Sequence, residues 1–201
     1  NKKLSPKRGN DVRDIHRQSS YVPEYQVRIK DVEQSHICMG VKGVPQEDEL
    51  YFPMILLNSI IGGSMSSRLF QNIREQKGLA YSVYSNSSSY VADGIYSIYA
   101  GVSHSKIDAA IEAIAEEMKL VSINGIGSDE LSIAKEQLKS SYVFGQENVN
   151  NRMYANGKNT LLLTRLLSIE EILDKIDRVN MDKLSVAASN ITDMDKYSAA
   201  I

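Results

Sequence analysis

The most regular pattern of apolar and polar positions lies near the middle of the chain. From Leu79 to Ser89, and again from Gly94 to Ser103, apolar and aromatic residues alternate with polar ones, and the stretch "ADG" separates the two runs. Val, Ile and Tyr fit a pleated surface, and a short link containing glycine joins antiparallel neighbours. The pattern therefore predicts an antiparallel hairpin.

Two further strands are predicted toward the ends of the chain. The stretch from Gln34 to Val44 combines β-branched and apolar residues with glycines, and it ends before Pro45, which cannot continue a central strand. The closing letters "DKYSAAI" predict a last strand that ends at Ile201. We expect both strands to join the hairpin in one sheet.

A buried helix is predicted in "DELYFPMILLNSII", which is apolar almost all round. Pro53 conflicts with a helix that starts at Asp48, because an interior proline loses a hydrogen bond, so we expect a later start or a kink. The glycine pair in "GGSMSS" should end this helix at Ile61. Ser66 or Ser67 can then cap the next helix.

This next helix should end near Gly78. Spacing at helical intervals divides its residues into two faces. The apolar face consists of Leu69, Phe70 and Ile73, and the face expected in water consists of Arg68, Gln71, Asn72 and Glu75.

After the hairpin, apolar residues recur at helical spacing along most of the chain. Helix N-termini are predicted at two capping-box patterns and one serine cap, namely Ser105 with Asp108, Ser168 with Glu171, and Ser128. Another helix is expected from Asn148 to about Leu163. Terminal strands, a central hairpin and a helical block predict an α+β fold, with an open, mostly antiparallel sheet and helices packed on one face.

The first twenty residues differ from the rest, because they are polar, mostly charged and without apolar periodicity. We interpret residues 1–20 as a linker or arm and residues 21–201 as a single domain. The chain begins with Asn1 and not with Met, which suggests a piece of a longer polypeptide. No internal repeat is visible.

Composition narrows the class of partner. Lys and Arg number 23 and Asp and Glu 25, which gives a formal charge of -2, so there is no basic excess for nucleic acid or an anionic membrane. No apolar run has the roughly 18 to 20 residues of a membrane span. Cys38 is the only cysteine, which is compatible with a reducing compartment, and we expect a cytoplasmic location.

Candidate metal ligands are sparse. His16, His36 and His104 lie far apart in the sequence, and neither H-x-x-E-H nor H-E-x-x-H occurs. Cys38 lies in a predicted strand, where we expect a small buried side chain. The tyrosines of the hairpin lack neighbouring basic residues, so we expect them to pack the sheet and not to bind nucleic acid. The sequence predicts no zinc site in this chain.

One pair of polar residues lies across a tight reversal. Arg74 comes near the end of a predicted helix, Gly78 turns the chain, and Tyr81 is the third residue of the following strand. The reversal can bring both side chains to one edge of the sheet, where a guanidinium and a phenol could donate to peptide carbonyls or an oxyanion. The alternative is a solvated arginine beside a tyrosine of the core.

The stretch "GGSMSSRLFQNIREQKGLAYSV" carries the most specific signal in the sequence. Its glycine pair, its helix, the Arg of "IREQ", the Gly-Leu pair and the Tyr occur in a characteristic order and spacing. Followed by "DGIYSIYAGVS" and a long helical block, it resembles the second half of an M16-type zinc metallopeptidase, of the insulinase or mitochondrial-processing-peptidase-like kind. The resemblance extends over nearly all of residues 21–201.

This resemblance implies a protease of two similar α+β halves that face each other as a clamshell. In that family the first half carries H-x-x-E-H and a later Glu, and the second half contributes an Arg and a Tyr to the substrate cleft. Arg74 and Tyr81 match that pair, which makes them the expected catalytic and substrate-binding residues. Gly62 and Gly63 match the glycine-rich loop that borders the cleft. In the family's scheme zinc activates water, while the Tyr and Arg donate to the substrate carbonyl.

Because H-x-x-E-H is absent, we interpret the chain as the C-terminal half of such an endopeptidase, inactive by itself, with zinc bound by an absent N-terminal half. The expected partners are that half, on the same chain or on another subunit, and a peptide substrate. A homodimer is left open. The alternatives are a non-catalytic scaffold or regulatory subunit of the same family, and an independent peptide-binding module.

Overall fold

The structure, a computed structural model, describes residues 19–162 and 166–201. Five strands form one sheet in the order β1-β5-β2-β4-β3. Their bounds are Tyr25–Gln26 (β1), Ser35–Lys42 (β2), Ala80–Ser89 (β3), Gly94–Val102 (β4) and Ser198–Ala200 (β5). All neighbours are antiparallel except β1 and β5, which run parallel. The predicted open, mostly antiparallel sheet is confirmed. Most of the predicted arm, residues 1–20, lies outside the described residues.

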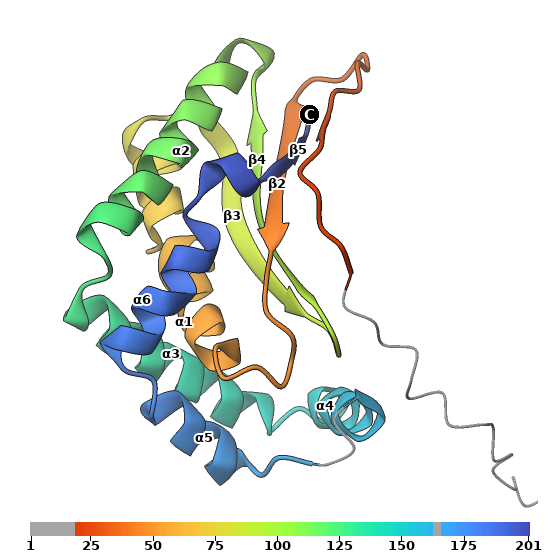
Figure 1. The fold of residues 1–201 in the computed structure, drawn as a ribbon, viewed down its shortest axis with the longest axis vertical. Helices are drawn as coiled ribbons and strands as arrows, with labels where there is room; N and C mark the ends of the chain where they lie inside the picture. Colours follow the sequence, from red (N-terminus) through yellow and green to blue (C-terminus); the bar gives the residue numbers. More distant parts are fainter. Residues whose placement is uncertain (1–18, 163–165) are drawn as a thin grey trace, which may run out of the picture.

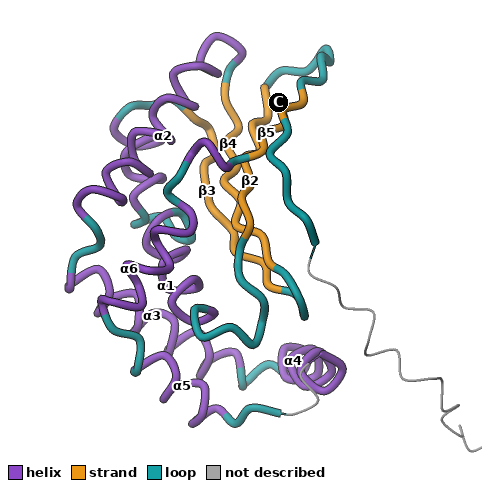
Figure 2. Tube along the Cα trace, in the orientation of Figure 1, coloured by secondary structure: helices purple, strands orange, loops and turns teal. Residues whose placement is uncertain are grey.

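Most of the helices lie on one face of this sheet, as Figure 1 shows, and Figure 2 shows the strands gathered in a layer of their own. The helices span Tyr51–Ile61 (α1), Phe70–Gln76 (η2), Ile107–Asn124 (α2), Ser128–Gly145 (α3), Val149–Leu162 (α4), Ile169–Asp177 (α5) and Met181–Ile191 (α6), with single turns at His104–Lys106 (η3) and Met194–Lys196 (η4). The predicted α+β class is therefore confirmed. Within the described residues no helix combines the length and the apolar character that crossing a membrane requires.

The proline conflict in the first helix is resolved by a later start. Helix α1 begins at Tyr51, so Pro53 is its third residue, where a backbone N–H would have no partner within the helix. The helix ends at Ile61, as predicted, and the backbone nitrogens of Gly62 and Gly63 both donate to Asn58 O. The glycine pair therefore ends α1.

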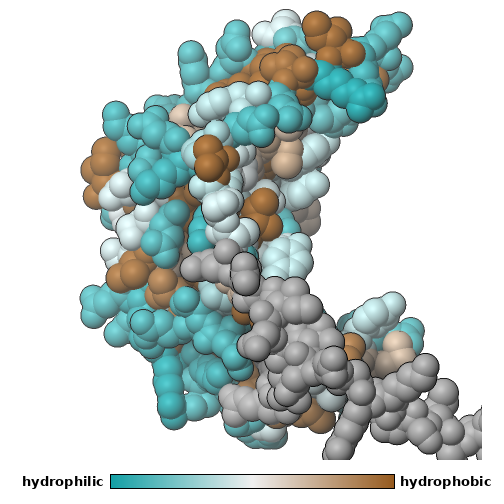
Figure 3. Space-filling model, turned by 45° about the vertical axis from the view of Figure 1, so that its right-hand side comes forward, coloured by the Kyte–Doolittle hydropathy of each residue, from teal (hydrophilic) through white to brown (hydrophobic). Residues whose placement is uncertain are grey.

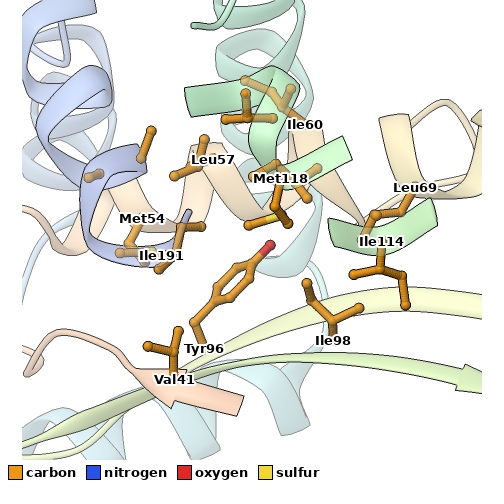
Figure 4. Close-up of a cluster of buried hydrophobic side chains, with 14 of the residues drawn as sticks. Val41, Met54, Leu57, Ile60, Leu69, Tyr96, Ile98, Ile114, Met118 and Ile191 are labelled. Carbon is orange, nitrogen blue, oxygen red and sulfur yellow. The ribbon is translucent and has the colours of Figure 1, made fainter. Parts of the chain in front are cut away.

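The core lies between the helices and the sheet. Figure 4 shows Tyr96 of β4 pointing from the sheet toward Met118 of α2, with Met54 and Leu57 of α1 nearby. These side chains are fully buried, and burying each apolar one stabilises the fold by about 1.5–3 kcal/mol. Burial also raises the pKa of the Tyr96 hydroxyl. Alternating residues of β4 and the apolar faces of the helices therefore form one continuous core.

Three predicted helix caps are wrong and one is confirmed. No side chain caps η2, and Ser67 Oγ instead donates to the oxygen of Ser64 at 2.6 Å. No side chain caps α2, which starts at Ile107 after the single turn η3, so Ser105 is not its cap. Helix α3 is preceded by Gly127, whose nitrogen donates to Glu130 Oε2 at 2.8 Å, and Ser128 is already inside the helix. Ser168 does cap α5 by accepting from the nitrogen of Glu171 at 3.2 Å.

Cys38 is exposed, so the expectation of a small buried side chain is wrong. Side chains alternate across β2, and Ile37, Met39 and Val41 point into the core. Cys38 therefore lies on the opposite face, which no helix covers. Figure 3 brings this side of the molecule forward and shows hydrophobic side chains in separate groups among hydrophilic ones.

Candidate functional site

The glycine pair holds the loop after α1 against the edge strand β3. The oxygen of Gly62 accepts from the nitrogen of Ser85 at 3.0 Å, and Ser85 Oγ donates to Asn58 Oδ1 at 2.8 Å. A Cβ added at Gly62 would lie 2.8 Å from the Cβ of Ser85, and one added at Gly63 would lie 2.9 Å from the Cα of Ser59. Both positions therefore need glycine for close approach of the backbone.

Helix η2 is a π-helix, which the sequence analysis did not predict. The nitrogen of Lys77 donates to Asn72 O at 3.1 Å, five residues back, which is the bond that widens the turn. π-helices are rare and occur frequently at functional sites. Gly78 follows with φ of +58°, a left-handed conformation that favours glycine, and it turns the chain toward β3 as predicted.

Arg74 lies in the last turn of η2, and its side chain is 44% exposed. The guanidinium lies over the ring of Phe70, with 4.8 Å from Cζ to the ring centroid. Its Nε is 3.8 Å from Glu75 Oε1, too far for a hydrogen bond. The donors of Arg74 are therefore available to a ligand.

Tyr81 lies in a β-bulge at the start of β3. Ala80 pairs with Val102 and Ser82 with Gly101, so Tyr81 is an extra residue without a partner on β4. Bulges change the direction of a side chain and occur often next to active sites. Tyr81 is 60% exposed, on a strand that forms the edge of the sheet. Nothing in the sequence pattern distinguished this bulge from regular alternation.

The structure places Arg74 and Tyr81 on the two sides of one short reversal, both with exposed side chains. In the described part of the chain, the two side chains do not hydrogen-bond to each other. The helix end and the bulge therefore offer two separate sets of donors, a planar guanidinium fork and a single hydroxyl. Such donors can bind carbonyl or carboxylate oxygens.

A polar cluster that the sequence analysis missed lies behind η2. Arg68 and Asn72, which we expected in water, are both partly buried. Nε and Nη2 of Arg68 donate to the two carboxylate oxygens of Glu130 at 2.8 and 2.7 Å. This bond lowers the pKa of the Glu130 carboxyl and raises the pKa of Arg68. The two partners are 62 residues apart, so no local pattern signals their contact.

The open face of the sheet carries an aromatic cluster. The rings of Tyr84 and Tyr99 stack with centroids 4.9 Å apart, and His36 Nδ1 is 2.7 Å from the hydroxyl of Tyr99. The prediction that hairpin tyrosines pack the sheet is confirmed at these positions. Offset stacking of this kind adds about 0.5–1.5 kcal/mol to the burial of the rings.

The residues that the structure describes do not form a set of metal ligands. His104 is held by Ser35 Oγ at 2.6 Å and by Val32 O at 2.8 Å, and His36 is held by Tyr99. Across residues 19–162 and 166–201, no three His, Cys, Asp or Glu side chains gather closely enough to ligate a metal ion. His16 lies outside the described residues.

A cavity of about 580 Å³ lies elsewhere, between the start of α1 and helices α3, α4 and α5. Its walls include Tyr51, Phe52, Tyr142 and Lys175. None of the four predicted site residues lines it. Burial raises the pKa of Tyr142 to about 12, which is a consequence of packing at the floor of this cavity.

Comparisons with known proteins agree on one family. Residues 2–138 match the family model described as the peptidase M16 inactive domain. The chain is 41% identical over 174 residues to an uncharacterized zinc protease of Bacillus subtilis, YmxG, which covers 87% of this chain and 42% of YmxG. It is 35% identical over 162 residues to an uncharacterized zinc protease of Streptomyces coelicolor, covering 81% of this chain and 35% of that protein.

The fold is also that of solved structures. A peptidase M16 inactive domain from Pseudomonas fluorescens superposes with a TM-score of 0.81 at 20% identity, over 92% of this chain and 44% of that one. A conserved protein from Enterococcus faecalis gives 0.77 at 22% identity, over 91% and 43%. The chain spans less than half of the length of these relatives. The predicted resemblance is confirmed, and the chain belongs to the peptidase M16 family.

Proposed function

We propose that this chain is the substrate-binding C-terminal half of a zinc-dependent metalloendopeptidase. The observation that carries the proposal is the irregular backbone at the reversal. A π-helix ends beside Arg74 and a β-bulge presents Tyr81, and both side chains keep their donors free. The relatives are called zinc proteases, and we assign these two residues to the substrate-cleft pair that the resemblance to the M16 family implies.

The chemistry assigned to the pair is hydrogen bonding to a peptide carbonyl. As the carbonyl carbon becomes tetrahedral, its oxygen gains negative charge, and preorganised donors stabilise that charge more than they stabilise the substrate. The Tyr81 hydroxyl supplies one donor and the Arg74 fork supplies several in one plane. Zinc is assigned to polypeptide outside this chain, because the described residues offer no ligand cluster.

The test uses the full-length protein with both halves. Tyr81→Phe removes one hydroxyl and should lower kcat on the order of a hundredfold with little change in KM, as loss of an oxyanion donor does. Tyr84→Phe is the matched control, because Tyr84 is also an exposed tyrosine of β3 but stacks on Tyr99. Equal turnover in both variants and the wild type would remove Tyr81 from the mechanism.

The second candidate is a non-catalytic scaffold or peptide-binding subunit of the same family. The observation in its favour is that residues 2–138 match a family model described as the peptidase M16 inactive domain. The coding sequence upstream of Asn1, together with the genes of candidate partner subunits, separates the two functions. An H-x-x-E-H motif there supports the peptidase, and its absence from both supports the scaffold.

A further inference from the structure

The polar cluster behind η2 connects this helix to two others. Arg68 donates to Glu130 of α3 through two nitrogens, and its Nη2 also donates to the oxygen of Gly125 at 3.2 Å. Its Nη1 is 3.9 Å from Glu117 Oε1 of α2. One guanidinium therefore reaches the C-terminal end of α2 and the N-terminal turn of α3 at the same time.

Asn72 has two roles in the same place. Its side-chain Nδ2 donates to Glu117 Oε2 at 2.5 Å, and its backbone oxygen accepts the Lys77 bond that makes the turn a π-turn. Glu117 is only 5% exposed, so its carboxylate needs partners inside the protein. The side chain that satisfies this carboxylate thus belongs to the residue that forms the wide turn.

Apolar contacts alone would leave the rotation of η2 less defined. Leu69 and Ile73 are fully buried and fix how deeply the helix lies. Hydrophobic burial is not directional, whereas hydrogen bonds to planar groups depend strongly on angle. Within residues 19–162 and 166–201, the side-chain contacts of Arg74, two residues after Asn72, are the Phe70 ring and a distant Glu75. Its position is therefore set by the backbone of η2.

We infer that Arg68, Asn72 and Glu117 are positioning residues, which fix the rotation of η2 and through it the place of Arg74 at the cleft. This inference rests on the proposed function of Arg74. A displacement of about 1 Å at a reacting group can lower a rate by roughly a hundredfold, so a cluster on the far side of the helix can affect turnover. None of the three residues touches the substrate in this role.

The central variant is Asn72→Asp in the full-length, two-half protein. The new carboxylate would face that of Glu117 in a buried place, and repulsion would turn η2 away from α2. Adding Glu117→Gln to it restores one hydrogen bond with its direction reversed, because the amide at position 117 then donates to the carboxylate at position 72. The double variant is the rescue.

Two measurements follow these variants. In Asn72→Asp we expect kcat to fall by about tenfold or more, with KM within about twofold of the wild type, because only the geometry of the donors changes. We also expect faster amide hydrogen exchange over residues 70–80, without a matching change in α6. The double variant should regain most of the turnover and of the protection.

A structural effect alone is excluded by a stability-matched control. Ile191→Val removes one methylene from a buried residue of α6 and lowers global stability by about 0.5–1.5 kcal/mol. Combined with a second α6 substitution, Ala188→Gly, it can be matched to Asn72→Asp in urea midpoint. An equal fall of kcat in this control, or unchanged exchange over residues 70–80 in Asn72→Asp, would overturn the inference.

Failure of the proposed function has a different signature. Full turnover in Arg74→Ala and Tyr81→Phe would remove the pair from catalysis and with it any catalytic effect of positioning. If those two variants lose turnover while Asn72→Asp keeps it despite faster exchange, the proposed function stands and the positioning role falls. Loss in all three variants, with rescue by the double variant, supports both.

Discussion

Helices η2 and α4 both carry apolar residues, but those at η2 are buried and those of α4 are exposed. Leu69, which directly precedes η2, and Ile73 within it are fully buried, and the polar residues behind them are paired. In α4, Val149, Met153 and Leu161 are 76%, 59% and 82% exposed. Figure 1 shows α4 at one end of the molecule, apart from the layer formed by the other helices.

The difference shows what apolar spacing does and does not specify. Spacing in α4 is sufficient to predict a helix, and the predicted limits of Asn148 to Leu163 agree with Val149–Leu162. Burial of the apolar side requires a surface to pack against, and the described residues provide one for η2 but not for α4. The helix that carries a candidate site residue is therefore the one whose position is fixed on several sides.

Truncation of Leu69, directly before η2, and of Leu161 in α4 tests this contrast with the largest expected effect. Leu69→Ala should lower the free energy of unfolding by about 2–5 kcal/mol, because it leaves a cavity under η2. Leu161→Ala should change it by less than about 0.5 kcal/mol, because that side chain is already in water. Urea unfolding of the full-length protein measures both. A large loss in Leu161→Ala would show that α4 packs against the other half.

Glycine to alanine changes should shift the stability in opposite directions in the loop that precedes η2 and in α4. The Cβ introduced by Gly62→Ala would overlap the backbone of β3 at Ser85, so we expect a loss of about 1–3 kcal/mol from overpacking. Gly157→Ala introduces a Cβ with no atom within 4 Å in the interior of α4, so we expect a gain of about 0.5–1 kcal/mol. Melting temperatures of the two variants against the wild type give the sign. Two changes of the same sign would contradict the contrast.

Local patterns predicted the parts of the fold that depend on neighbours in sequence. Alternation predicted the β3 and β4 hairpin, the proline indicated a later start or a kink in α1, and Ser168 with Glu171 predicted the start of α5. The candidate site residues were predicted from the resemblance of one stretch to the M16 family, and their roles stay a prediction. That stretch includes the turn at Gly78, whose positive φ is a local requirement.

Long-range contacts were the part that could not be predicted. Arg68 and Asn72 read as solvated because their partners, Glu130 and Glu117, lie 62 and 45 residues further along the chain. The bulge at Tyr81 depends on the register against β4, which alternation in a single strand does not contain. Cys38 was assigned to the core although period-two alternation places it opposite Ile37 and Met39.

The smallest expected effect is a pH dependence that belongs to the η2 side of the comparison. The hydrogen bond from Arg68 is the main cause that holds the pKa of Glu130 below its ordinary 4.5, with smaller help from the nitrogen of Gly127, while partial burial acts in the opposite direction. A depressed pKa in the folded state means that the pair stabilises the protein above the ordinary pKa. This stabilisation is lost as pH falls through the lower, folded pKa. Because the Glu130 side chain is 36% exposed, solvent screening keeps the effect below those of the leucine and glycine changes.

The measurement compares unfolding free energies of the wild type and Glu130→Gln from pH 7 to pH 3. Their difference should be constant at the neutral end and should shrink once the pH falls below 4.5, because protonation then removes in the wild type what the substitution has already removed. Lys158→Gln in α4 is the matched control, since α4 contains no Asp or Glu and its loss of charge should leave the acid slope of the wild type unchanged. Parallel pH curves for the wild type and Glu130→Gln would mean that the Arg68 bond adds nothing to the stability of the fold, and η2 would then be held by its apolar side and by the bond from Asn72 to Glu117.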